Sequence, residues 1–159
     1  MTTTNGSSPA PISSEEIHRF LDDGFIRIDH VIDDDDLAWY RRQYDTLFDD
    51  AREGVKRKKL GGTDAAGRDA LPQVLAPNKT IPELKARPYF KKITAIAKAI
   101  LGPEAEFRND HMILKPAGYG VATPWHQDQA YHDPGYAYKN INFWLPLEDA
   151  TVESGCLQY

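Results

Sequence analysis

Two residues whose types and spacing suit metal binding stand in the segment 123–131: His126 and Asp128, with one residue between them. In an extended strand, residues two apart point to the same face with their Cα atoms roughly 6.6 Å apart. On a helix the same spacing would send them to opposite sides. Pro124 and the neighbouring aromatic residues favour the strand. An imidazole and a carboxylate on one face are two of the three ligands of the facial triad that holds ferrous iron in oxygenases.

The His-x-Asp spacing also has simpler interpretations. A histidine hydrogen-bonded to a nearby aspartate is the usual structural one, and a zinc hydrolase could use the same two ligands. No third ligand stands at a familiar hydrolase spacing, although His132 could complete an unusual local triad. The single cysteine, Cys156, excludes multi-cysteine zinc sites and an intrachain disulfide within this sequence.

Four sequence blocks around this pair, in their order and spacing, resemble the phytanoyl-CoA dioxygenase family. They are MILKP at 112–116, TPWHQD at 123–128, WLPLEDA at 144–150 and ESGCLQ at 153–158. With the DGF element at 23–25, the resemblance covers most of the chain, from about residue 12 to residue 159. It implies a double-stranded β-helix (jelly roll) that binds Fe(II) and uses 2-oxoglutarate as co-substrate. The implied reaction is hydroxylation of an aliphatic C–H bond in a small molecule.

The resemblance also implies roles for individual residues. His126 and Asp128 match the first two iron ligands of the family. Contacts with 2-oxoglutarate are implied, with a less secure match for the first, at Gln73, Met112, Gln127 and Trp144. Each of these has a plainer interpretation, since a methionine is more often core filler than a ligand contact. A tryptophan beside asparagines is equally a half-buried surface residue.

The segment 140–147 alternates in a way that bears on Trp144. If its apolar residues at odd positions face the core, the opposite face carries Asn140, Asn142 and Trp144. That face is a plausible wall of a pocket.

The sequence departs from the family pattern downstream of the block at 153–158. The family's second metal histidine and its 2-oxoglutarate-binding arginine match no residue here. We therefore expect residues 13–159 to be the N-terminal portion of a jelly-roll domain, incomplete relative to eight strands, behind a disordered tail at 1–12. Such a portion alone should hold iron and co-substrate weakly, because the arginine's bidentate contact has no substitute. A non-catalytic remnant or binding module of the same fold is the alternative to an enzyme.

The elements that must position these residues are predicted to be helices first and strands afterwards, which indicates a mainly β, α+β fold with a helical preface. A capping box opens the first helix at Ser13, and Gly24 ends it. Four aspartates at 33–36, interpreted as an N-terminal cap, precede a second helix. A third runs between Pro88 and Gly102.

A short β-prone run is predicted directly after the first helix, at 25–28. Further β-prone segments follow the third helix, at 107–115, 124–130 and 140–147. The segment 52–72 is predicted to be a loop, whose basic residues could attract a CoA-type anion.

Bulk composition is ordinary for one soluble domain. The chain has 159 residues, 41% hydrophobic and 27% charged, with a net charge of −5. This acidic balance argues against general affinity for nucleic acid or anionic membranes. We expect a cytoplasmic protein, because there is one cysteine, no secretory signal pattern and no apolar run of the roughly 20 residues that a membrane span needs. The sequence does not indicate an oligomeric state.

Overall fold

The computed structural model describes residues 11–49, 57–59 and 62–159. The tail predicted at 1–12 lies outside the described residues except for its last two. Ile12 is buried, with 5% of its surface exposed. Packing against the domain therefore begins before the predicted boundary at residue 13.

The first helix, α1 (Ser14–Asp23), forms as its signals predict. The Ser13 hydroxyl accepts from the Glu16 N–H at 3.2 Å, and the Glu16 carboxylate accepts from the Ser13 N–H at 2.8 Å. Gly24 ends the helix in the left-handed conformation, with φ 79°. The strand predicted at 25–28 is wrong, because Phe25 stacks on the ring of Tyr159 at 4.4 Å and the run joins no described strand.

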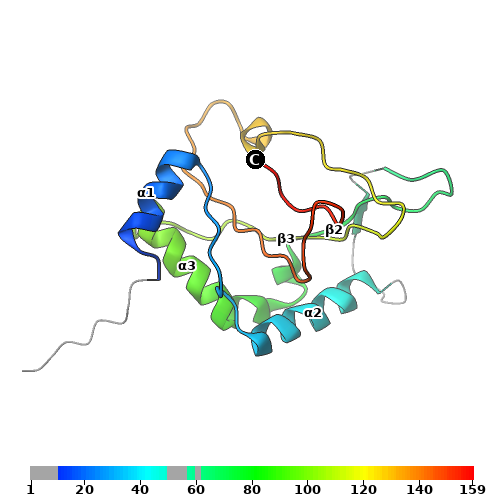
Figure 1. Cartoon of the computed structure of the whole chain (residues 1–159), viewed down its shortest axis with the longest axis horizontal. Helices are drawn as coiled ribbons and strands as arrows, with labels where there is room; N and C mark the ends of the chain where they lie inside the picture. Colours follow the sequence, from blue (N-terminus) through cyan, green and yellow to red (C-terminus); the bar gives the residue numbers. More distant parts are fainter. Residues whose placement is uncertain (1–10, 50–56, 60–61) are drawn as a thin grey trace, which may run out of the picture.

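Helices α2 (Asp34–Phe48) and α3 (Pro88–Leu101) lie along the lower edge of the molecule, with the long loops of residues 115–159 above them (Figure 1). Leu47 of α2 and Ile96 of α3 are completely buried. The main core cluster consists of Tyr40, Leu47, Val74, Ile81, Leu84 and Tyr89. Burial of such side chains contributes roughly 1.5–3 kcal/mol each to folding.

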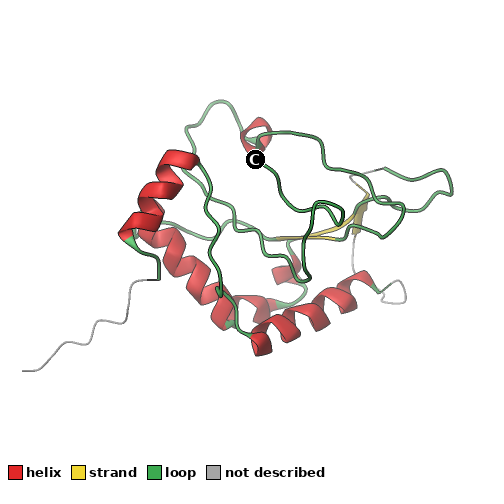
Figure 2. Cartoon of the chain, in the orientation of Figure 1, coloured by secondary structure: helices red, strands yellow, loops and turns green. Residues whose placement is uncertain are grey.

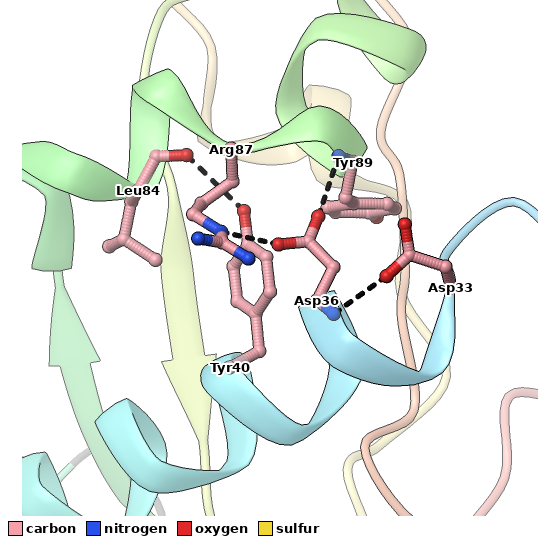
Figure 3. Close-up of polar contacts among 6 residues, drawn as sticks. All are labelled: Asp33, Asp36, Tyr40, Leu84, Arg87 and Tyr89. Carbon is pink, nitrogen blue, oxygen red and sulfur yellow. Dashed lines mark hydrogen bonds and ion pairs between the residues drawn. The ribbon is translucent and has the colours of Figure 1, made fainter.

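A buried carboxylate joins the first turns of α2 and α3. Asp36, 1% exposed, accepts from the backbone N–H of Tyr89 at 2.8 Å and from Nε of Arg87 (Figure 3). Asp33 supplies the N-cap of α2 by accepting from the Asp36 N–H at 2.7 Å. The Tyr40 hydroxyl adds a bond to the carbonyl of Leu84 at 3.3 Å. The acidic run is therefore more than the predicted cap, because Asp36 also clamps the two helices together.

Three short strands form one antiparallel sheet in the order β1-β2-β3. They are β1 (Arg57–Lys59), β2 (Pro72–Leu75) and β3 (His111–Ile113). Two 3-10 helices, η1 (Pro77–Lys79) and η2 (Pro82–Ala86), lead from β2 to α3.

Two features of this sheet correct the predictions. β1 lies inside the segment predicted as a loop, and β1 and β2 precede α3, so helices do not all come before strands. An edge strand tolerates Lys and Arg because it needs no continuous apolar face. A search for apolar runs therefore misses β1. The CoA-type anion prediction rests partly on residues outside the described ranges.

Most of the β-prone sequence after α3 forms neither strands nor helices. From residue 102 onward every residue is described, and β3 and η3 (Asp128–Tyr131) are the regular elements there, as Figure 2 shows. The predicted strands at 124–130 and 140–147 are thus wrong as strands, because neither has a ladder partner in the described ranges. No helix in the described part of the chain is long and apolar enough to cross a membrane.

Candidate metal site

His126 and Asp128 converge although they do not lie on a strand. Nε2 of His126 is 3.2 Å from Oδ1 of Asp128. The backbone of Gln127 is extended (φ −116°, ψ 130°), which keeps the two-residue period between them. Asp128 then opens the 3-10 helix η3, where the Ala130 N–H bonds to the carbonyl of Gln127 at 3.0 Å. Local turn bonds replace the predicted ladder.

The separation of the two atoms suits one shared ion. Metal–ligand bonds to imidazole nitrogen and carboxylate oxygen are about 2.1 Å long. Two such ligands at right angles on an octahedral ion stand about 3 Å apart, close to the observed 3.2 Å. The two side chains are 39% and 54% exposed, so the pair is open to incoming molecules.

The far side of the imidazole fixes its orientation. Nδ1 of His126 is 2.7 Å from the carbonyl oxygen of Pro124, which can only accept, so Nδ1 carries a proton. In the neutral ring, Nε2 then presents a lone pair to the carboxylate of Asp128. Two facing acceptors at this distance require a proton or a cation between them. The pair is therefore either an imidazolium–carboxylate bridge or two ligands of one cation.

The far side of the carboxylate is held as well. Nδ2 of Asn142 donates to Oδ2 of Asp128, while Oδ1 faces His126. Partners of this kind orient metal ligands and are typical of metal sites. The sequence predictions did not assign Asn142 to the site. The signal was the alternation in 140–147, which put it on the face opposite the core.

His132 does not join this pair. Its ring packs against Tyr138, with centroids 4.4 Å apart, and its Nδ1 is buried without a hydrogen-bond partner. Within the described ranges, no group of three His, Cys, Asp or Glu side chains could hold a metal. The local triad through His132 is thus wrong, and no third ligand for the predicted pair lies within the described residues.

Gln73 and Met112 lie on opposite faces of the sheet. Met112 pairs with Val74 and packs against the core cluster, whereas Gln73 pairs with Ile113. Because directly opposed residues share a face and neighbours alternate, the two side chains point apart. Gln73 is 5% exposed, and its amide has no hydrogen bond to another described residue. The sheet itself therefore does not bring them together.

The other two predicted co-substrate contacts are exposed. Trp144 is 47% exposed and lies two residues beyond Asn142 in a segment without regular secondary structure. Gln127 is exposed, and its side chain makes no hydrogen bond within the described ranges. Their roles toward 2-oxoglutarate remain predictions.

Comparison with known proteins now bears on this geometry. The family model for phytanoyl-CoA dioxygenase (PhyH) matches residues 20–159. The chain belongs to the phytanoyl-CoA dioxygenase family. This confirms the resemblance carried by the four sequence blocks, and with it the relation to Fe(II)- and 2-oxoglutarate-dependent dioxygenases.

Two curated enzymes are similar in sequence to this chain. Ectoine dioxygenase of Stutzerimonas stutzeri (strain A1501) is 31% identical over 120 residues, covering 75% of this chain and 38% of the relative. L-Proline trans-4-hydroxylase of Streptomyces griseoviridis is 26% identical over 157 residues, covering 96% of this chain and 55% of the relative. The chain thus spans about half the length of the curated relatives it matches, or less.

A solved structure shares the fold. EvdO2 from Micromonospora carbonacea var. aurantiaca, in complex with 2-oxoglutarate, superposes with a TM-score of 0.62 and 39% identity over 77% of this chain and 51% of its own. A second crystal structure of EvdO2 gives a TM-score of 0.63 at 38% identity. The chain therefore folds like the corresponding part of EvdO2.

Proposed function

We propose that the protein is an Fe(II)- and 2-oxoglutarate-dependent dioxygenase that hydroxylates an aliphatic C–H bond of a small molecule. The observation that supports this most is the arrangement of His126 and Asp128. Nε2 of His126 and a carboxylate oxygen of Asp128 face each other at 3.2 Å, and each side chain has a hydrogen-bond partner on its far side. That donor set fits two of the three protein ligands of a facial triad.

In this proposal, His126 and Asp128 would hold the ferrous ion, and both side chains are partly exposed to solvent. Bound iron with 2-oxoglutarate supplies the oxidative chemistry, in which substrate, 2-oxoglutarate and O₂ become hydroxylated substrate, succinate and CO₂. Trp144, which is 47% exposed and on the same segment as Asn142, is the residue we assign to the co-substrate wall. Gln127, next to both ligands, is a second candidate contact. Met112 and Gln73 are further candidates, although from opposite sheet faces.

We propose that the third iron ligand and the arginine for 2-oxoglutarate come from sequence that continues this chain. Two facts support it. The described residues contain no group of three potential metal ligands, and the relatives extend well beyond the matched region, which is 38% and 55% of their lengths. Continuation would also provide ladder partners for the extended segments and complete the barrel.

The substrate class is proposed from chemistry at the rim of the site. Trp125 and Tyr131, which flank His126 and Asp128 in the sequence, are 76% and 79% exposed. Aromatic faces of this kind suit compact, partly apolar molecules. Two relatives are named for small molecules, ectoine and L-proline. We place the reaction in the cytoplasm, because a single cysteine suits a reducing compartment.

Anaerobic metal titration tests this function. The protein, expressed from its complete reading frame, is titrated with Fe(II) by calorimetry with and without 2-oxoglutarate. We expect one Fe(II) per chain and tighter binding when 2-oxoglutarate is present, because the co-substrate chelates the same ion. Zn(II) serves as the comparison metal.

Two outcomes would replace the proposal. Tight Zn(II) binding that 2-oxoglutarate leaves unchanged indicates a zinc hydrolase. An absence of binding by either metal indicates a non-catalytic member of the fold, in which His126 and Asp128 form only a protonated salt bridge.

A further inference from the structure

We infer that Asn142 is a positioning residue that makes Asp128 bind the metal through one oxygen. This inference rests on the proposed function. The amide of Asn142 donates to Oδ2 of Asp128, and Oδ1 is the oxygen turned toward Nε2 of His126. The two carboxylate oxygens thus have different partners from two different segments of the chain.

It matters whether Asp128 uses one oxygen or two, because the ion has a limited number of coordination positions. A facial triad leaves open positions for the co-substrate and O₂ only if its carboxylate occupies a single one. A free carboxylate can bind through both oxygens, as carboxylates do on other cations. A donor that occupies Oδ2 opposes this second contact. Asn142 therefore preserves an open position without touching the ion.

The segment that carries Asn142 is anchored to the helical layer. Nε of Arg41, on α2, donates to the carbonyl of Leu147 at 2.6 Å and lies 3.1 Å from the carboxylate of Glu148. Leu145 and Leu147 pack against the core cluster. These contacts lie three to six residues beyond Asn142 in the chain and tie its backbone to the core. The amide is held in place by packing that the metal does not supply.

The test compares N142A and N142D with N140A in the protein expressed from its complete reading frame. Asn140 is exposed, belongs to the same segment and makes no side-chain hydrogen bond to another described residue. Co(II) replaces Fe(II) as the probe, because its visible absorption reports coordination number. We expect N142A to bind Co(II) roughly 10- to 100-fold more weakly with an altered spectrum. N142D places a second carboxylate beside Asp128, so its Co(II) affinity and spectrum should differ from those of both the parent and N142A. N140A should match the parent in both quantities.

Each result separates this inference from the proposed function. If H126A abolishes Co(II) binding while N142A and N142D keep the parent's affinity and spectrum, the role of Asn142 is refuted and the metal site stands. If H126A binds Co(II) like the parent, the proposed function fails first. A loss of thermal stability in N142A alone, with an unchanged spectrum, would indicate a merely structural amide and also refute the inference.

Discussion

Replacing His126 with alanine is expected to lower 2-oxoglutarate turnover by roughly a thousandfold or more. In the proposed site the histidine is one of two ligands, beside Asp128 at 3.2 Å, and its loss would leave Asp128 as the one proposed ligand among the described residues. A catalytic metal contributes several kcal/mol to transition-state stabilisation, and each 1.36 kcal/mol corresponds to about a factor of ten. Succinate formation in the protein from its complete reading frame measures the effect. D128A should give a loss of the same order.

The matched control is His18→Ala. His18 is an exposed histidine on α1 and does not contact His126 or Asp128. It should keep the parent's turnover. If H126A and H18A behaved alike, His126 would not be a metal ligand. If H126A lost activity only together with its fold, as seen by circular dichroism, the residue would be structural.

Replacing Asp36 with alanine is expected to reduce the free energy of unfolding by about 3–5 kcal/mol, the usual cost of leaving a buried charge unpaired. The variant leaves Nε of Arg87 and the backbone N–H of Tyr89 without their shared acceptor (Figure 3). The side chain of Asp36 is 1% exposed, so water cannot easily replace it. Urea denaturation followed by circular dichroism measures the change.

Asp35→Ala is the control for this prediction. Asp35 stands in the same first turn of α2 but is exposed. Its loss removes only a favourable interaction with the helix dipole, worth about 0.3–1 kcal/mol. Equal effects of D35A and D36A would show that the acidic run acts only as a cap. Because α2 also anchors the Asn142 segment through Arg41, D36A should weaken metal binding in addition.

The helices could be predicted because their signals are local. Ser13, Gly24 and the four aspartates mark ends within a few residues of the observed boundaries. The strands could not be predicted as well, because a strand is defined by its partner. The segment 140–147 has the right alternation, and Leu145 and Leu147 do face the core, yet no described strand pairs with it. β1, which carries no apolar residue, gave no signal at all.

In the site, too, contacts between sequence neighbours could be predicted, whereas contacts between distant residues could not. The pairing of His126 with Asp128 is set by a two-residue period, so spacing alone predicted that they converge. The contact between Asn142 and Asp128 joins residues 14 apart through tertiary packing, and no local pattern encodes it. The opposite placement of Gln73 and Met112 depends on strand register, which the sequence leaves open.

The most direct measurement is a crystal structure of the protein, from its complete reading frame, grown anaerobically with Fe(II) and 2-oxoglutarate. A single ion is expected within about 2.1 Å of both Nε2 of His126 and one oxygen of Asp128. The other carboxylate oxygen of Asp128 should accept a hydrogen bond from Asn142. Anomalous scattering at the iron edge identifies the ion. An iron bound elsewhere, or a proton-bridged pair that excludes iron at saturating concentration, would contradict the assignment of these two residues as ligands.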